Sequence, residues 1–380
     1  MQRRDFVKLG SIIAAAAPAG LEVSNHSAKG GPQIDFLHDG LQLTPKEYAA
    51  LLMKLADEGK IKPDFYSNGG VVEELEHKFA QLLGKESAVF MPTGTLANHL
   101  AIRQLSGNNR RVIVQEQSHI YNDTGDCSQI LSGLNLIPLG ENAVEFSVND
   151  VEKVFNKTKS GRVEAGIGAI AIETPVRRQQ DRMISYDNLK AICNYANSNG
   201  IKTHLDGARL FVQSVHTNID PSQYGKIFDT VFTSMWKCFN ASSGAILAGS
   251  NVFTEKLFHQ RRMFGGGLPA SWAFAAVALH YADGFLGEYK MAWANAEKFF
   301  AEIQKNEKFK IVKFENGSHI VKLTIANTNL IKFKESLKKK GIELSAPNET
   351  GFGLKINPSI NRDTPQNLAG YFLDSLKDAS

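Results

Sequence analysis

Short apolar segments alternate with helical patterns from residue 72 to residue 248 of this 380-residue chain. Between Val72 and Leu83 the apolar residues recur at helical spacing, and Gly84 is placed to end that helix. Because such alternation is typical of a sheet covered by helices on both faces, we expect an α/β fold with a mostly parallel sheet. The seven expected strands are Ala88–Met91, Arg111–Val114, Leu136–Leu139, Ile167–Ile172, Lys202–Leu205, Phe228–Thr233 and Gly244–Ala248.

The pattern changes from Trp272 onward, where a long helical stretch reaches Lys305. A strand at His319–Ile325, a helix through Lys340, a strand at Phe352–Ile356 and a last helix follow. This predicts a smaller α+β domain at the C-terminus. The expected division is a large domain over residues 64–271, a small domain over residues 272–380, and an N-terminal segment over residues 31–63 that leads into the large domain from outside it.

The first 30 residues predict an export signal. An Arg3-Arg4-x-Phe6-x-Lys8 spacing precedes the apolar run Leu9–Ala19, which ends in small residues. This order resembles a twin-arginine signal, which directs the export of folded proteins and implies a bacterial periplasmic or otherwise exported location. A basic terminus beside a short core helix is the alternative. Export after folding is useful when a cofactor must be inserted beforehand.

The composition excludes several classes of function. A net charge of +4, from 43 Lys plus Arg against 39 Asp plus Glu, is too small and scattered for a nucleic-acid surface. Cys127, Cys193 and Cys238 match neither a disulfide framework nor a zinc spacing, so we expect no metal. No apolar run of about 18 residues exists to span a bilayer, so we expect no membrane contact after signal removal.

Two candidate sites for an anion and a cation directly follow expected strands, where ligands of open α/β sheets bind. Thr93-Gly94-Thr95 offers hydroxyls and backbone amides at a helix N-terminus, which suits a phosphate; an ordinary N-cap is the alternative. Asp206 ends a buried strand, where its charge requires a cation such as a protonated pyridine nitrogen. Arg209 could pair with a substrate carboxylate, or Asp206 and Arg209 could pair with each other.

Two further candidates follow other strands. Lys237 comes just after a strand, near Trp236 and Phe239, and an amine among apolar groups has the lowered pKa that covalent catalysis requires. A surface lysine is the alternative. His119 could place its imidazole against a ring, although a lone histidine is more often structural.

Together these residues resemble the pyridoxal-phosphate enzymes of the aspartate-aminotransferase fold, and within them the threonine aldolase and β-eliminating lyase family. The most specific part is the His204-Leu-Asp-Gly-Ala-Arg209 string. The resemblance spans about residues 64–267. Its other segments are Leu75-Glu76, Leu83-Gly84-Lys85-Glu86, Thr93 to Asn98, Ser118-His119-Ile120, the segment around Lys237, Ala248-Gly249-Ser250 and Gly265-Gly266-Gly267.

The resemblance implies roles in binding pyridoxal 5'-phosphate. Lys237 would hold the cofactor aldehyde, Asp206 would pair with the ring nitrogen, and His119 would stack on the ring. The remaining implied contacts are Thr93, Gly94 and Thr95 with the phosphate, Ser234 as a helper there, Glu173 near the cofactor, and Arg209 facing the substrate carboxylate.

The chain departs from the family pattern mainly around the substrate. The family's Ser-Asp-Thr reads Asp39-Gly40-Leu41 behind His38, and the segment after Tyr66, a further substrate candidate, also differs. The residues after Lys237 are Cys-Phe-Asn in place of Gly-Leu-Gly. Lys355 takes the place of a carboxylate-binding arginine, which makes it a substrate candidate too.

The resemblance implies aldol cleavage of a β-hydroxy-α-amino acid such as threonine into glycine and an aldehyde, with His119 or a water that it holds as the base. β-Elimination at the same site is the alternative, and a non-catalytic exported binding protein on this scaffold is a third reading. Relatives with this fold place the active site at a dimer interface, which implies a homodimer or a homotetramer.

Overall fold

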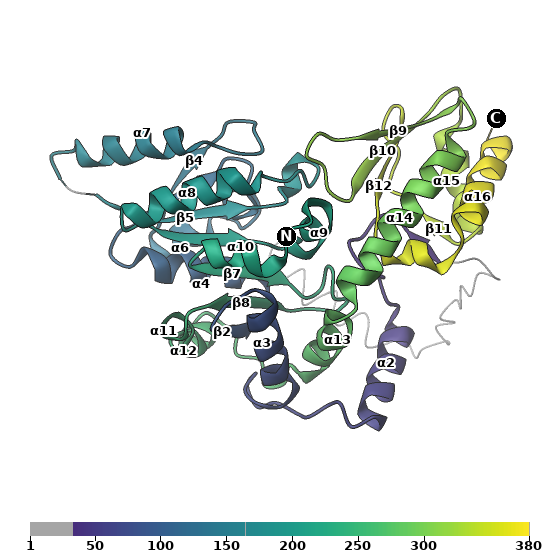
Figure 1. Cartoon of the computed structure of the whole chain (residues 1–380). Helices are drawn as coiled ribbons and strands as arrows, with labels where there is room; N and C mark the ends of the chain where they lie inside the picture. Colours follow the sequence, from purple (N-terminus) through teal and green to yellow (C-terminus); the bar gives the residue numbers. More distant parts are fainter. Residues whose placement is uncertain (1–32, 164, 380) are drawn as a thin grey trace, which may run out of the picture.

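The computed structural model describes residues 33–163 and 165–379, so the expected signal in residues 1–30 lies outside the described residues. Figure 1 shows two lobes, and a seven-stranded sheet forms the centre of the larger one. The sheet order is β2-β8-β7-β6-β5-β3-β4, and only β8 runs against its neighbours. The expected mostly parallel sheet is therefore confirmed. Its strands are β2 Ser87–Met91, β3 Arg111–Gln115, β4 Asn135–Leu139, β5 Ile167–Glu173, β6 Lys202–Asp206, β7 Thr230–Ser234 and β8 Ala245–Gly249.

Both faces of this sheet are buried, as a sheet with helices on each side requires. Along β8, Ile246 joins the apolar cluster on the α3 side, while Ala245 and Leu247 join the cluster on the α4 side. The same alternation explains why the central strands read as continuous apolar runs. The helices of this lobe are α3 Gly70–Leu82, α4 Gly94–Ser106, α5 His119–Asn122, α6 Cys127–Ser132, α7 Val148–Lys159, α8 Tyr186–Ser198, α9 Leu210–Thr217, α10 Pro221–Ile227, α11 Asn251–Thr254 and α12 Leu257–Met263, with a 3-10 turn at Arg177–Gln179.

The expected long helix from Trp272 is two helices, α13 Trp272–Ala282 and α14 Phe285–Ile303. They meet at Asp283 and Gly284, two residues of low helix propensity. Helix α14 extends from the large lobe into the small one (Figure 1). None of the helices in the described parts of the chain has both the length and the apolar content needed to cross a membrane.

The small lobe is built on a three-stranded antiparallel sheet in the order β12-β10-β9. Strand β9 was not expected from the sequence, because its outer residues alternate with lysines and only Phe309 is buried. The elements of this lobe are β9 Phe309–Lys313, β10 Ile320–Ile325, α15 Leu330–Lys339, β11 Ile342–Glu343, β12 Gly351–Lys355, a 3-10 helix at Pro358–Arg362, and α16 Pro365–Asp378.

The segment before the large lobe begins in the small lobe, and so enters the large one from outside it. Strand β1, Ile34–Asp35, pairs in parallel with β11. Phe36 packs against Phe299 and Phe372 in the small-lobe core, with ring centroids 6.2 Å apart in both pairs. The chain then continues through α2, Pro45–Asp57, to the large lobe. This packing fixes the position of the residues that directly follow Phe36.

Replacing Phe36 by alanine tests this anchoring. The side chain is 1% exposed, so the variant leaves a cavity, and we expect the free energy of unfolding to fall by about 3–5 kcal/mol in urea titrations. Ile331→Ala, at a 64% exposed position on α15 of the same lobe, is the control and should change it by at most about 0.5 kcal/mol. Equal effects of the two substitutions would contradict the anchoring.

Candidate active site

The carboxyl ends of the parallel strands converge on a cavity of about 200 Å³. Asp206 ends β6, Glu173 ends β5 and Ser234 ends β7, while Lys237 and His119 follow the ends of β7 and β3. The fold therefore brings together side chains from distant parts of the chain. All nine residues predicted to contact the cofactor line this cavity, namely Thr93, Gly94, Thr95, His119, Glu173, Asp206, Arg209, Ser234 and Lys237.

One end of the cavity is the N-terminus of α4. Thr93 is the N-cap, and its Oγ1 accepts a hydrogen bond from the Leu96 amide at 3.2 Å, so the simple capping role is present. At Gly94 a Cβ would lie 2.6 Å from Cζ of Phe232, which excludes larger residues. The Ser234 hydroxyl, 1% exposed, has no hydrogen-bond partner in the described structure. A helix N-terminus beside an unpartnered hydroxyl is suited to a phosphate.

The Asp206 carboxylate lines another part of the cavity. Its Oδ2 accepts a hydrogen bond from Asn98 Nδ2 at 2.6 Å, and its Oδ1 accepts one from the Ala208 amide at 3.2 Å. Among the described residues Asp206 forms no ion pair with Arg209, so the pairing left open by the sequence is absent. Asn98 was not predicted as a site residue, although it ends the segment Thr93 to Asn98 that carries part of the family resemblance.

Lys237 lies between this cavity and a larger one of about 820 Å³. The side chain is half-buried, and its Nζ lies 5.5 Å from the centre of the Trp236 ring. Burial and the charge of Arg209 lower the pKa of Lys237 below its usual value. A lowered pKa increases the fraction of neutral amine, which is the form that attacks a carbonyl.

His119 and Glu173 are linked on the wall between β3 and β5. The His119 amide donates to Glu173 Oε2 at 2.5 Å, and the Arg177 amide donates to Oε1 at 2.9 Å. The imidazole Nδ1 lies 3.6 Å from Asp123 Oδ2. Burial, together with the charge of Asp206, raises the pKa of Glu173 to about 8.

Two carboxylates of the protein itself face the Arg209 guanidinium, while its Nε has no hydrogen-bond partner in the described structure. Its Nη2 lies 2.9 Å from Asp39 Oδ2 and its Nη1 lies 3.3 Å from Asp181 Oδ1, and Arg209 is 4% exposed. Burial alone would lower the pKa of Arg209. The charges of the two carboxylates outweigh this effect and raise the pKa of Arg209 above its usual value. A substrate carboxylate would therefore compete with two internal ones.

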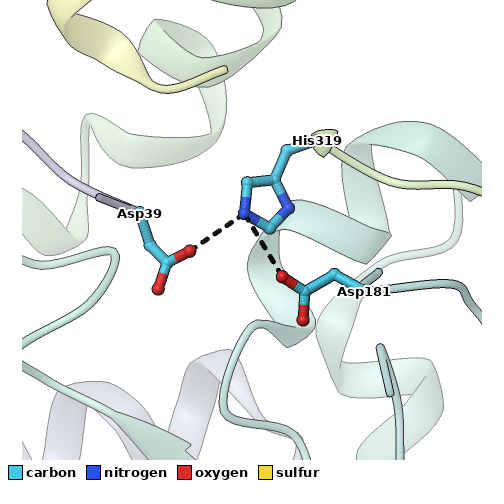
Figure 2. A group of neighbouring side chains, drawn as sticks. All are labelled: Asp39, Asp181 and His319. Carbon is cyan, nitrogen blue, oxygen red and sulfur yellow. Dashed lines mark hydrogen bonds and ion pairs between the residues drawn. The ribbon is translucent and has the colours of Figure 1, made fainter. Parts of the chain in front are cut away.

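Asp39 and Asp181 also meet a histidine of the small lobe, as Figure 2 shows. His319 Nε2 lies 2.9 Å from Asp39 Oδ1 and 3.7 Å from Asp181 Oδ2. Lys355 Nζ lies 3.2 Å from Asp39 Oδ1. Asp181 and His319 were not predicted from the sequence, because they lie in a turn after β5 and at the start of β10 with no motif around them.

The grouping of Asp39, Asp181 and His319 has the spacing of a metal site, with ligand atoms within 4.8 Å of one another. Two carboxylates there already face two cations, Arg209 and Lys355. A metal ion would sit beside a guanidinium and an ammonium, which is unfavourable. We therefore interpret the group as a buried ion network.

The substrate candidates are placed differently from one another. Lys355 lines the larger cavity, together with His38 and Asp39. Tyr66 lines neither cavity; its ring packs against Arg262, whose Cζ lies 4.2 Å from the ring centre.

Solved structures define the class to which this fold belongs. A candidate L-allo-threonine aldolase from Listeria monocytogenes superposes with a TM-score of 0.73 at 24% identity, over 90% of this chain and 95% of that one. A serine palmitoyltransferase of S. paucimobilis, solved with bound PLP and myriocin, superposes with a TM-score of 0.63 at 15% identity, over 98% and 97%. The fold is that of fold-type-I pyridoxal-phosphate enzymes.

The family follows from the sequence comparison. The model of the β-eliminating lyase family matches residues 58–327, and the chain belongs to this family. The "Probable low-specificity L-threonine aldolase" of Schizosaccharomyces pombe is 26% identical over 355 residues, covering 92% of this chain and 90% of that protein. The low-specificity L-threonine aldolase of Saccharomyces cerevisiae is 28% identical over 232 residues, covering 60% and 59%.

The raised pKa of Glu173 predicts a pH-dependent stability. Between its ordinary pKa of 4.5 and about 8, the unfolded chain has lost this proton while the folded chain keeps it. Stability is therefore lost as the pH rises through this range, by at most about 1.4 kcal/mol per pH unit.

In urea titrations of cofactor-free protein, Glu173→Gln should gain stability relative to wild type as the pH rises from about 5 to about 8. The exposed Glu152→Gln is the control and should show no such slope. A stability difference between Glu173→Gln and wild type that stays constant with pH would show that the buried carboxyl does not hold its proton.

Proposed function

We propose that this protein is a pyridoxal-phosphate-dependent lyase that cleaves the Cα–Cβ bond of a β-hydroxy-α-amino acid of the threonine type, releasing glycine and an aldehyde. The observation that carries the proposal is that one cavity joins the amine of Lys237, the carboxylate of Asp206 and the α4 N-terminus with Ser234. These three groups match the aldehyde, the ring nitrogen and the phosphate of one molecule. The names of the relatives support threonine-like substrates.

Different side chains of the protein would bind different parts of that molecule. When bound, pyridoxal phosphate supplies a ring that withdraws electrons from the substrate Cα. Lys237 would hold its aldehyde, and Asp206 would keep the ring nitrogen protonated by offering a negative charge. Gly94, Thr95 and Ser234 would bind the phosphate. Each of these groups has its polar atoms in or beside the same cavity.

His119 is the proposed base for the substrate β-hydroxyl. It lines both cavities, so its ring lies where the cofactor and substrate regions meet. Asp123 Oδ2 lies 3.6 Å from Nδ1, where its negative charge would stabilise the imidazole after proton uptake. The β-hydroxyl proton would move to Nε2 as the Cα–Cβ bond breaks.

Replacing Lys237 by alanine tests the assignment of Lys237 as the residue that holds the cofactor aldehyde. With pyridoxal phosphate and L-threonine, the wild type should release glycine and acetaldehyde in equal amounts, and Lys237→Ala should release neither. Lys226→Ala, at an exposed position, should retain the wild-type rate. Both products would be measured by coupled assays. Ammonia and a keto acid in place of glycine would instead indicate β-elimination, and turnover by Lys237→Ala would contradict the assignment.

Lys355 is the proposed partner of the substrate carboxylate. Arg209 is engaged by Asp39 and Asp181, whereas Lys355 has only Asp39 as an ion-pair partner among the described residues and its side chain is 27% exposed in the larger cavity. Because Lys355 is more exposed in the cavity than Arg209, its ammonium group would pair with the substrate carboxylate more readily than the Arg209 guanidinium would.

Lys355→Met should therefore raise the KM for L-threonine about tenfold, the effect of losing one charge-assisted hydrogen bond, with little change in kcat. Lys355→Arg keeps the charge and should remain close to wild type. Steady-state kinetics separate the two constants. An unchanged KM in Lys355→Met would mean that another group binds the carboxylate.

Two further proposals concern the whole molecule. We propose export by the twin-arginine route, supported by the Arg3-Arg4-x-Phe6-x-Lys8 spacing, and N-terminal sequencing of the exported protein would locate the cleavage.

We also propose a homodimer or homotetramer. Tyr66 lies outside both cavities of its own chain, so a role at the substrate would require a second subunit. Light scattering would measure the assembly.

A further inference from the structure

A chain of buried polar side chains runs from β7 to the Asp206 carboxylate. Thr230 Oγ1 lies 2.8 Å from His204 Nδ1, and His204 Nε2 lies 2.8 Å from Asn98 Oδ1. Asn98 Nδ2 lies 2.6 Å from Asp206 Oδ2. Thr230 and His204 are 0% exposed and Asn98 is 1% exposed, so water does not compete for these contacts.

The direction of each hydrogen bond follows from the chemistry of the groups. An ionised carboxylate only accepts, so Asn98 must turn its NH2 group to Asp206 and its carbonyl oxygen to His204. His204 Nε2 must then donate. Burial lowers the pKa of His204 to about 4, so the ring is neutral at pH 7 and carries one proton only. Nδ1 therefore accepts from the Thr230 hydroxyl.

The opposite orientation of the Asn98 amide is unfavourable. It would place Oδ1 of Asn98 against Oδ2 of Asp206, and two buried oxygen acceptors would face each other at 2.6 Å. Every hydrogen bond in the chain thus points in one direction, from Thr230 to Asp206. Hydrogen bonds aligned in this way polarise one another and strengthen the last donor.

We propose that Asn98 and His204 are positioning residues for Asp206, holding it as an ionised carboxylate with one oxygen fixed and its charge available to the cofactor ring nitrogen. The proposal rests on the proposed function. Asn98 would act directly on Asp206, and His204 would act through Asn98 by fixing the orientation of its amide. Neither residue contacts the reacting atoms.

A purely structural role predicts a different result. If Asn98 and His204 only satisfy buried polar groups, removing them weakens the binding of any cofactor-like molecule equally. If they set the charge and orientation of Asp206, their removal weakens only the part of the binding that depends on the ring nitrogen. The ratio of two affinities distinguishes these cases, because general damage to the fold cancels in it.

The test measures the dissociation constants of full-length protein for pyridoxal 5'-phosphate and for its analogue with carbon in place of the ring nitrogen, by equilibrium dialysis. Wild type should bind the analogue about tenfold or more weakly, the size of one charge-assisted hydrogen bond. In Asn98→Leu, which fills the space without a donor, this ratio should fall to about threefold or less.

Two other variants complete the design. His204→Phe should also lower the ratio, and His204→Gln, whose amide can still donate to Asn98, should restore it. Ser106→Ala is the control, since Ser106 is a buried polar residue on the same helix whose Oγ has no partner in the described structure, and it should leave the ratio unchanged. If Asn98→Leu does not fold, the histidine pair decides the question.

The outcomes distinguish a failure of the positioning role from a failure of the proposed function. A wild-type ratio that persists in Asn98→Leu or His204→Phe would overturn the positioning role and leave the proposed function intact. A wild-type protein that binds neither molecule would overturn the proposed function and the positioning role with it. A wild-type ratio near one would show that Asp206 does not interact with the ring nitrogen, which also overturns the proposal.

Discussion

The buried charge of Arg209 is the interaction on which the arrangement of the site depends. A guanidinium between β6 and α9 is stable in this interior only because Asp39 and Asp181 approach from two other segments. Asp39 follows β1 of the small lobe, and His319 and Lys355 of that lobe contact it in turn. One ion network therefore ties the two lobes together at the edge of the active-site cavity. Phe36 anchors the segment that supplies Asp39.

The cofactor region and the substrate region draw their side chains from different parts of the fold. Around the cofactor, the side chains lie at strand ends and are held by hydrogen bonds within the large lobe, as with Asp206 between Asn98 and Ala208. Around the substrate, the charges come from loops and from the second lobe, as with Asp39 and Lys355. Two of the departures from the family pattern, at Asp39 and Lys355, fall in the second region. Substrate choice can therefore vary while the cofactor region keeps its arrangement.

The sequence predicted the sheet and the cofactor cavity because both depend on short-range order. An apolar strand followed by a polar residue places that residue at the sheet edge, so Asp206 and Lys237 could be found without knowing the topology, whereas Glu173 and Ser234 came only from the family resemblance. The partners of Arg209 could not be found in this way, because Asp181 and His319 reach it through contacts between distant segments. Strand β9 was missed because it is buried at one residue only.

The most direct test of the account is to trap the cofactor on the protein. Wild-type protein incubated with pyridoxal phosphate would be reduced with borohydride, digested and mapped by mass spectrometry. The account predicts the added mass on the peptide that contains Lys237, and no added mass there in Lys237→Ala. Added mass on another lysine such as Lys355, or no modified peptide at all, would contradict the assignment of the cavity at the strand ends as the cofactor site.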